Sequence, residues 1–325
     1  MIMKLLVTGG AGYVGSHCCK AFAEAGWDVT VFDNLSRGWR EFVQFGEFYE
    51  GDIMNPDDLA DAIAKVKPDA VAHFAAFAYV GESVTDPGLY YRNNTQGTLN
   101  ILEAMRDGGV DKLLFSSTCA TYGVPAEMPI HEELPQSPIN PYGWSKLFVE
   151  KMMWDFSAAH DMQCVALRYF NAAGADRDAR IGERHDPEPH VIPLAIRGAM
   201  KDDFTFTILG DDFDTRDGTC VRDYIHVEDL ADAHKRAIEY MAKGGASNYF
   251  NLGTGNGTTV KEIADAVERV SGKPLPRRVG DRRPGDPPAL IADPTKAREV
   301  LGWVATRSSI DNIVQSAWNW HAKEV

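Results

Sequence analysis

A glycine-rich turn near the start of the chain constrains the fold more than any other sequence feature. The apolar run over residues 3–7 predicts a buried strand, and residues 13–25 predict a helix. The turn between them has the pattern G-x-G-x-x-G with one extra glycine in front, made by Gly9, Gly10, Gly12 and Gly15. Such glycines allow a tight turn, close backbone approach to a pyrophosphate and close packing of helix on strand. The helix start would also present unpaired N–H groups to phosphates.

An acidic residue follows the second predicted strand, which lies at 28–32. Asp33 has the separation from the glycines at which a carboxylate meets a ribose hydroxyl of a bound dinucleotide. Its negative charge would repel a 2′-phosphate, so the pattern favours NAD over NADP. Arg37 and Arg40 lie nearby and leave NADP open. The alternative is a glycine turn with a purely structural role.

Composition excludes several classes of partner. The 325 residues carry a formal net charge of −14 and no basic run, which argues against binding to nucleic acid or to an anionic membrane. No apolar run approaches the length of a membrane span. The five cysteines show neither metal-ligand spacing nor a disulfide framework, so we expect a cytoplasmic setting and no metal site.

Strand and helix signals alternate along the first half of the chain. Further strands are expected at 48–50, 70–74, 112–116 and 164–170, and helices at 56–66, 87–106 and 141–160. This order predicts an α/β fold with a Rossmann-like, doubly wound parallel sheet covered by helices on both faces. Ligands of such sheets bind at the carboxyl ends of the strands.

The character of the sequence changes after residue 171. Residues 174–189 are rich in Gly, Pro, Asp and Arg and predict a loop. Shorter segments follow, with helices expected at 192–200, 228–242 and 260–270 and strands at 204–209 and 249–252. We expect an NAD-binding domain at 1–171 and a smaller C-terminal α/β substrate lobe at 172–325. Segments within about 223–252 could return to the main sheet.

Tyr142 and Lys146 are the strongest catalytic candidates. They follow Asn140-Pro141, residue types that favour a helix start, and a spacing of four places phenol and ammonium on one helical face. The ammonium would lower the pKa of the phenol from about 10 towards a range useful for a general base. Thr118, after a predicted strand, could hold a substrate alcohol beside Tyr142; a plain strand-end residue is the alternative.

Further motifs are spread over essentially the whole chain: 8–17, Asp33-Asn34-Leu35, His73-Phe74-Ala75-Ala76, Val80-Gly81-Glu82-Ser83, Phe115-Ser116-Ser117, Tyr122-Gly123, 168–171 and 221–227. Together they resemble the UDP-glucose 4-epimerase family of extended short-chain dehydrogenase/reductases. The resemblance implies tightly held NAD and reversible epimerisation at C4 of UDP-glucose and UDP-galactose through a transient 4-keto sugar.

The resemblance also implies roles for single residues. Tyr142 would be the general base, Lys146 would bind the nicotinamide ribose and tune Tyr142, and Thr118 would align the sugar hydroxyl. Residues implied at the cofactor are Gly9, Gly10, Gly12, Tyr13, Val14, Gly15, Asp33, Asn34, Asp52, Ile53, Phe74, Ala75, Ala76, Asn93, Lys146 and Phe170. Residues implied at the UDP-sugar are Thr118, Tyr142, Asn171, His190, Val191, Leu209, Arg222, Arg283, Asp286 and Leu290, although His190 could equally be structural.

An acidic chain needs a local basic cluster to bind a diphosphate. Arg222 and the pair Arg282-Arg283 are expected to supply it, because guanidinium groups donate paired hydrogen bonds. One departure from the family pattern is Ala78, where the family often has a lysine. Its loss should weaken NAD binding or shift its contacts.

Two other functions are compatible with the same fold. A nucleotide-sugar 4,6-dehydratase needs an acid and a base, usually Asp-Glu by family resemblance, whereas Thr118 is followed here by Cys119-Ala120. A non-catalytic, NAD-sensing binding protein would not need both Tyr142 and Lys146.

Leu290 bears on the choice of sugar. In the family pattern this position borders the C2 substituent, where tyrosine would exclude an N-acetyl group and a small residue would admit it. We expect UDP-hexoses to be better substrates than UDP-N-acetylhexosamines, and the UDP-pentoses UDP-xylose and UDP-arabinose stay open. The resemblance further implies a homodimer formed through the helices at 87–106 and 141–160.

Overall fold

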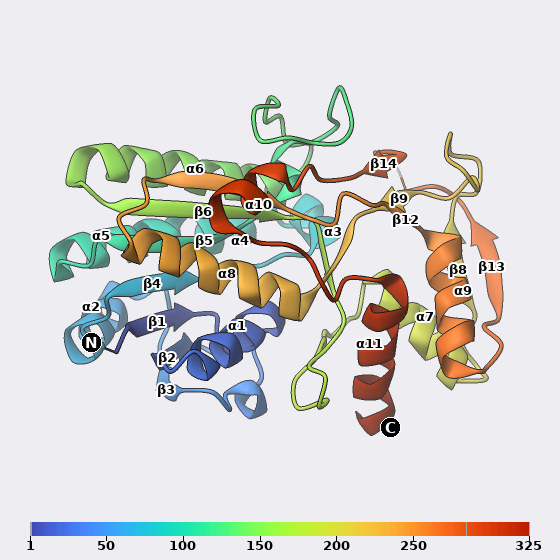
Figure 1. Ribbon diagram of the computed structural model, residues 1–325, viewed down its shortest axis with the longest axis horizontal. Coiled ribbons are helices and arrows are strands. Elements are labelled where there is room, and N and C mark those ends of the chain that lie inside the picture. The colour runs from blue at the N-terminus through green and yellow to red at the C-terminus, as the bar shows by residue number, and fades with distance from the viewer. Residues whose placement is uncertain (1, 284, 325) are drawn as a thin grey trace.

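A seven-stranded parallel sheet forms the centre of the larger lobe (Figure 1). The computed structural model describes residues 2–283 and 285–324. The strands of this sheet are β1 (Lys4–Thr8), β2 (Asp28–Asp33), β3 (Glu47–Glu50), β4 (Ala70–His73), β5 (Lys112–Thr118), β6 (Gln163–Tyr169) and β11 (Asn248–Leu252). Their order is β3-β2-β1-β4-β5-β6-β11, and every neighbouring pair is parallel. The predicted Rossmann-like, doubly wound sheet is confirmed.

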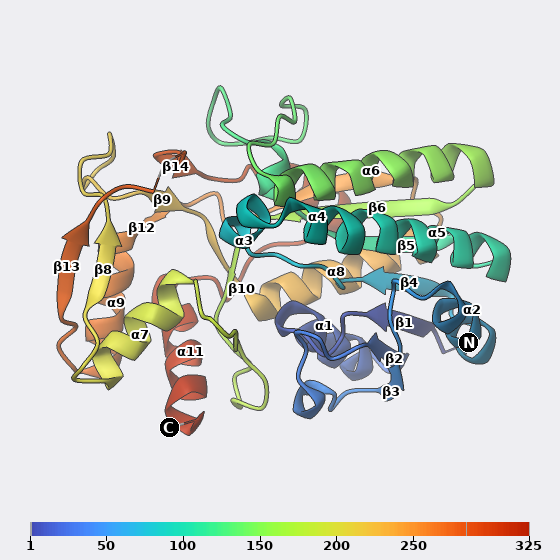
Figure 2. The ribbon, with the colours of Figure 1, turned by 180° about the vertical axis from the view of Figure 1, so that it is seen from behind.

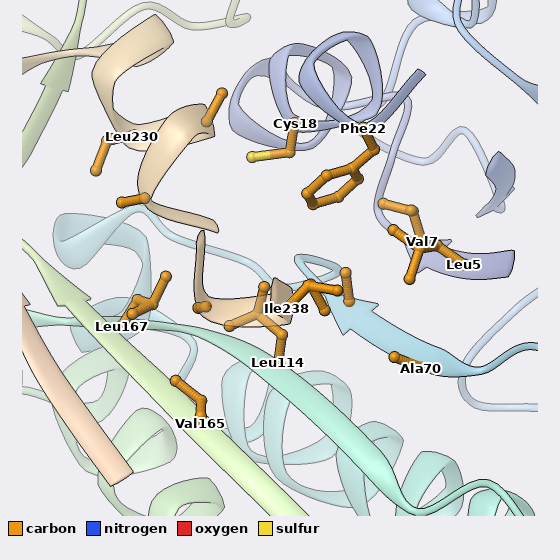
Figure 3. Packing of buried hydrophobic residues seen from close by; sticks show 14 of the residues in the cluster. Leu5, Val7, Cys18, Phe22, Ala70, Leu114, Val165, Leu167, Leu230 and Ile238 are labelled. Carbon is orange, nitrogen blue, oxygen red and sulfur yellow. The ribbon is translucent and has the colours of Figure 1, made fainter. Parts of the chain in front are cut away.

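Helices cover both faces of this sheet, as the two opposite views show (Figures 1 and 2). One face carries α1 (Tyr13–Glu24) and α8 (Val227–Ala242), and the other carries α2 (Pro56–Val66), α5 (Gly97–Gly108) and α6 (Pro141–His160). Side chains alternate between the faces of a strand. Leu5 and Val7 accordingly pack with Phe22 of α1 (Figure 3), whereas Leu6 packs with the helices of the opposite face.

The strand order reverses between β1 and β4. From β1 the chain proceeds outward through β2 and β3, and β4, β5 and β6 then fill the other side. A crossover in each direction leaves an opening at the carboxyl ends of β1 and β4, where dinucleotides bind to such sheets. The glycine turn follows β1 at this position.

A smaller C-terminal α/β lobe lies beside the carboxyl edge of the sheet (Figure 1). Its helices are α7 (Val191–Met200), α9 (Val260–Ser271) and α11 (Ile310–Glu324). Its short strands pair as β13 (Arg277–Gly280) with β8 (Phe206–Leu209), and as β12 (Thr258–Thr259) with β9 (Val221–Arg222) and β14 (Ala289–Leu290). Ile196, Ile208, Ile263 and Val314 belong to a separate buried core of this lobe.

The connection between the lobes is a further parallel pair, β7 (Asn171–Ala173) with β10 (Tyr224–His226). The chain crosses to the smaller lobe after β7, returns through β10 and α8 to β11, and then crosses again. Six short strands were not predicted, because strands of two to four residues show no periodicity: β7, β9, β10, β12, β13 and β14. The helix α11 was not predicted either. Short helical segments complete the chain: η1 (Arg40–Phe42), α3 (Val80–Thr85), α4 (Pro87–Tyr90), η2 (Tyr91–Gln96), η3 (Cys119–Thr121) and α10 (Thr295–Leu301).

The helix expected at 87–106 is interrupted by a π-helical turn, η2, between α4 and α5. Asn94 of this turn is buried, and its side chain accepts from the Phe77 N–H at 2.9 Å. The amide of Asn94 donates to the Phe77 carbonyl and to Ser145 Oγ, each at 3.0 Å. The turn is therefore bonded both to the segment after β4 and to α6. Such turns occur frequently at functional sites.

A buried ion cluster joins α1, α8 and the segment after β7. Lys20 of α1 donates to Glu228 at 2.8 Å and also to Asp176. Burial opposes ionisation of Asp176, but hydrogen bonds from Arg180 and Lys20 hold its pKa well below the ordinary range. The first turn of the smaller lobe is thus fixed to the helix that follows the glycine turn.

Among the described residues, we find no helix long and apolar enough to cross a membrane.

Candidate active site

The glycine turn has the geometry of a phosphate-binding loop. Gly9 has φ +76°, and a Cβ there would lie 2.4 Å from the backbone nitrogen of Ala75. A Cβ at Gly15 would lie 2.2 Å from the Gly9 carbonyl oxygen, which explains the close packing of α1 on the turn. At Gly12 and the start of α1, no side chain of the described chain caps the helix. Free N–H groups at a positive helix end suit a pyrophosphate, so the loop fits a dinucleotide.

Tyr13 and Val14 begin the helix behind this loop. The Tyr13 hydroxyl donates to the Gly174 carbonyl at 2.6 Å, so the phenol also ties the loop to the segment after β7. Burial raises the pKa of Tyr13, and Val14 is half-buried against the main core.

Asp33 lies at the carboxyl end of β2, beside the glycine turn. Its carboxylate accepts from the Ala11 N–H at 3.0 Å and from the Leu35 N–H at 2.8 Å. These bonds fix the carboxylate although burial raises its pKa, and each oxygen keeps a lone pair for a ribose hydroxyl. Next to it, Asn34 donates to Asp52 at 3.1 Å. The structure therefore brings the expected adenosine-side residues together.

Ile53, which follows Asp52 in the chain, is buried, and its carbonyl accepts a hydrogen bond from the Asn100 side chain at 2.9 Å. At the end of β4, the Phe74 and Ala75 N–H groups both donate to the Thr8 carbonyl, at 2.8 and 3.0 Å. These bonds hold the segment through Ala76 against the end of β1.

Two residues expected at the nicotinamide end come from other elements. Asn93 lies in η2 and donates to Asn94 at 3.0 Å. Phe170 follows β6 and is buried in a small cluster with Tyr122, Ile130 and Ala292. Asn93 and Phe170 therefore remain candidates on the basis of their position in the fold.

Tyr142 and Lys146 lie in the first two turns of α6, near the end of β5. Lys146 is buried, donates to the Ser116 carbonyl at 2.9 Å and lies 4.7 Å from the Phe115 ring centre. Burial lowers the pKa of this ammonium to about 7, against the opposing effect of Glu150. Thr118 ends β5, and its side chain lies near enough to the Tyr142 phenol to lower the pKa of that phenol in part. The expected trio is therefore assembled at one end of the sheet.

The expected lowering of the pKa of Tyr142 is wrong for the ligand-free protein. Burial raises this pKa, and the neighbouring Tyr169 raises it further, while the Thr118 side chain opposes the shift only in part. Spacing on a helix shows that an ammonium is near, but it does not show the cost of desolvating the phenolate.

A buried network behind Thr118 was not foreseen. Glu150 of α6 accepts from Ser117 at 2.6 Å and from Arg168 at 2.6 Å, and Gln136 donates to its second oxygen at 3.1 Å. Glu150 is one helical turn after Lys146, a spacing that sequence inspection could have noted. These bonds hold β5, β6 and α6 in register at the catalytic end.

A second group of residues faces the site from the smaller lobe. Arg222 of β9 lies 3.6 Å from Asp286, and Arg283 lies 3.4 Å from the other oxygen of the same carboxylate. Leu290 pairs with Arg222 in the parallel contact of β14 with β9. Arg222, Arg283, Asp286 and Leu290 therefore converge, as expected.

The basic cluster is smaller than expected, because Arg282 does not join it. Arg282 pairs with Asp212 and lies 4.1 Å from the Phe213 ring centre. Arg222 remains well buried, whereas Arg283 is two-thirds exposed. Leu209 lies at the end of β8 and is partly exposed, and the Asn171 N–H donates to the Asp223 carbonyl at 3.0 Å.

Cys119 links the two groups of residues. Burial raises the pKa of this thiol to about 12, and the charge of Arg222 opposes the shift. Cys119 also acts on Tyr142, so the guanidinium and the catalytic trio share one neighbour. Cys119 and Leu290 also pack against the same small core as Phe170, which brings the end of β5 near β14.

His190 precedes α7, and Val191 begins that helix. Burial lowers the pKa of His190, but the negative charges of Glu183 and Glu188 have the larger effect and raise this pKa to about 10. His185 lies beside the same carboxylates. The sequence analysis singled out His190 alone and missed the other three, although the spacing Glu-x-His-x-x-Glu-x-His is visible in the chain.

Known proteins share this arrangement over nearly the whole chain. A curated relative from Rhizobium leguminosarum bv. trifolii, named UDP-glucose 4-epimerase, is 54% identical over 319 residues, which are 98% of this chain and 97% of the relative. The structure of UDP-glucose 4-epimerase from Brucella ovis in complex with NAD matches with a TM-score of 0.95 and 48% identity, covering 98% of each chain. That of the Bifidobacterium longum enzyme in complex with NAD⁺ and UDP matches with a TM-score of 0.93 and 39% identity, again covering 98% of each.

These matches confirm the resemblance inferred from the motifs. The family description that fits the sequence, "NAD dependent epimerase/dehydratase family", applies to residues 5–253, which include the glycine turn, the candidate catalytic residues and Arg222. With the geometry of the site, this match shows that the chain belongs to the NAD dependent epimerase/dehydratase family.

Proposed function

We propose that this chain catalyses the reversible, NAD-dependent epimerisation of UDP-glucose and UDP-galactose at C4. The observation that carries the proposal is the assembly of Tyr142, Lys146 and Thr118 at the carboxyl end of β5, beside the dinucleotide loop. Relatives that align over 98% of this chain bear the same enzyme name.

NAD would bind along the carboxyl ends of β1, β2 and β4. The glycine turn with Tyr13 and Val14 would hold the pyrophosphate, and Asp33 would hold the adenosine ribose. Asn34, Asp52 and Ile53 would surround the adenine side, and Phe74, Ala75, Ala76, Asn93, Lys146 and Phe170 would lie along the remainder. Bound NAD⁺ supplies a positive ring and an acceptor that takes the hydrogen of C4 as hydride and returns it.

Tyr142 would remove the proton of the sugar 4-hydroxyl. Burial raises its pKa, so the phenolate needs a neighbouring positive charge, which Lys146 supplies when protonated. The Thr118 hydroxyl lies near the phenol and would hold the sugar oxygen within reach. After the 4-keto sugar turns over in the site, Tyr142 would return the proton as the other face of C4 is reduced. The net redox change is zero.

The nucleotide end of the substrate would bind between the lobes. Arg222 and Arg283 would face the diphosphate, whose negative charge would compete with Asp286 for both guanidinium groups. Asn171, His190, Val191, Leu209, Asp286 and Leu290 would complete the UDP-sugar site.

A 4,6-dehydratase is not favoured. After the same oxidation, that reaction needs a base to remove the C5 proton and an acid to protonate the departing C6 hydroxyl. Cys119 stands in the relevant position, and its thiol stays protonated at neutral pH because burial raises its pKa to about 12.

We further propose that two chains form a dimer through α5 and α6, which lie side by side on one face (Figure 2). Trp144 and Phe148 of α6 are exposed apolar side chains that stack with each other, and Phe148 also meets Tyr91. A large apolar group on one helical face is typical of a protein interface.

The five cysteines are free thiols in the described chain, which supports a cytoplasmic location.

Tyr142→Phe should abolish most turnover without abolishing NAD binding. Loss of the proton acceptor should lower kcat by about 10²- to 10⁴-fold, the range that general acid–base catalysis supplies. The assay follows UDP-galactose conversion to UDP-glucose, and cofactor content is measured on the denatured protein. Tyr240→Phe, near the far end of α8, is the matched control and should keep normal turnover. Unchanged turnover in Tyr142→Phe would show that Tyr142 is not the proton acceptor, and absence of turnover in the wild type would favour a sensing role.

Phe148→Asp should convert a dimer into a monomer. A charge at the centre of an apolar contact would remain desolvated and unpaired. Light scattering at micromolar protein concentration measures the mass, and Val304→Asp places the same charge at an exposed valine elsewhere. A monomeric wild-type protein would contradict the dimer.

Leu290→Ser should improve the use of N-acetylated sugars. In the wild type we expect kcat/KM for UDP-N-acetylglucosamine to be one to two orders of magnitude below that for UDP-glucose, or about 1–3 kcal/mol in transition-state binding. The serine variant should narrow that gap, and Leu290→Tyr should widen it. The same series, run with UDP-xylose and UDP-arabinose, decides whether pentoses are substrates. Equal wild-type turnover of both hexose types would show that Leu290 does not control entry.

A further inference from the structure

Four metal-ligating side chains converge in one short segment between β7 and α7. Glu183, His185, Glu188 and His190 each direct one potential ligand atom to a common point, and these atoms all lie within 4.8 Å of one another. Over residues 2–283 and 285–324, no other group of three or more His, Cys, Asp or Glu side chains meets this spacing.

The distances around His185 differ from those of ordinary hydrogen bonds. Its Nδ1 lies 3.5 Å from Glu183 Oε1 and 3.4 Å from Glu188 Oε2. Nδ1 is buried and lacks a hydrogen-bond partner within the described part of the chain. Good hydrogen bonds span about 2.7–3.2 Å, whereas ligand atoms around a tetrahedral ion with bonds of about 2.0–2.1 Å are about 3.3–3.4 Å apart. The two separations from His185 are therefore close to the edge length of such a tetrahedron.

His190 completes the group. Its Nδ1 lies 2.9 Å from Glu183 Oε1 and 2.7 Å from Glu188 Oε1. These shorter contacts are hydrogen bonds through a proton on the imidazole. An ion would replace that proton and move the atoms apart by a few tenths of an ångström.

The backbone of the segment is fixed from outside. Trp320 donates to the Glu183 carbonyl at 3.0 Å, and Trp39 donates to the Arg184 carbonyl at 3.2 Å. The rings of Tyr13 and Tyr79 meet His185 edge-on. Glu183 is buried, while His190 is partly exposed and leaves a path for an ion. The ligand atoms are therefore held close together before any ion binds.

We propose that Glu183, His185, Glu188 and His190 form a binding site for a divalent transition-metal ion, best suited to Zn²⁺. Two imidazole nitrogens and two carboxylate oxygens make a four-coordinate N₂O₂ set with two negative charges, which balances a divalent cation. Ca²⁺ and Mg²⁺ prefer sites made of oxygen alone. Binding releases the proton held between His190 and the carboxylates to solvent.

The ion would fix His190 in place beside the UDP-sugar site and would take no part in the chemistry at C4. The segment lies between Tyr13, which follows the glycine turn, and α7 of the smaller lobe. A bound ion would cross-link this connection. Its loss should lower the thermal stability of the protein at an unchanged NAD content.

The experiment titrates Zn²⁺ into chelator-treated protein by calorimetry and measures the bound ion by elemental analysis. We expect one ion per chain, protons released on binding and a raised Tm. His185→Ala and Glu188→Gln should each weaken binding by more than the about 10- to 100-fold that loss of an outer-shell partner costs. His131→Ala, which removes an exposed histidine 3.2 Å from Glu127, is the matched control and should bind Zn²⁺ normally.

Substitution of the wild-type site with Co²⁺ gives a test that does not depend on folded variants. A four-coordinate N/O site should give strong visible absorption that Zn²⁺ abolishes. The proposal is overturned if wild-type protein binds no Zn²⁺, if the Co²⁺ spectrum is that of the hydrated ion, or if folded His185→Ala and Glu188→Gln bind as tightly as wild type. In each case the cluster would consist of histidine–glutamate pairs alone.

Discussion

The burial of Lys146, and the partial burial of Tyr142 beside it, is the constraint on which the rest of the site depends. Removal from water raises the pKa of the phenol and lowers that of the ammonium to about 7, so burial disfavours the charged form of both groups before ligands bind. Charges brought by the ligands then decide whether phenolate forms. The fold maintains this dry position, because β5, β6 and α6 are bonded behind it through Glu150.

The same logic governs the substrate side. A chain of net charge −14 would repel a nucleotide sugar unless cations were placed locally. Arg222 and Arg283 are held by one carboxylate, Asp286, which keeps both guanidinium groups near each other. Arg282 is taken up by Asp212 instead. Recognition of the diphosphate would thus depend on two arginines, of which Arg222 alone is well buried.

Much of this could be predicted from sequence, because its signals are local. The glycine turn, Asp33 and the Tyr142–Lys146 spacing each follow from one segment, and the alternation of elements gave the sheet. Interactions between distant segments could not be predicted. The π-helical turn depends on Asn94 reaching Phe77 and Ser145, and the raised pKa of Tyr142 depends on neighbours from several elements. The Glu183–His190 cluster lies within one predicted loop, and the spacing of its residues in the chain does not show the backbone course that brings their side chains together.

The central claim is that hydrogen leaves C4 and returns to the same sugar within one site. The most direct measurement uses a mixture of two substrates in ordinary water without added NAD. One is UDP-galactose deuterated at C4, and the other is UDP-glucose that carries ¹³C but no deuterium. The account predicts that deuterium remains at C4 of the molecules that carried it, in both epimers, with no exchange into solvent or into the ¹³C-labelled pool. Loss of deuterium to water, or a need for added NAD in amounts equal to the substrate, would contradict it.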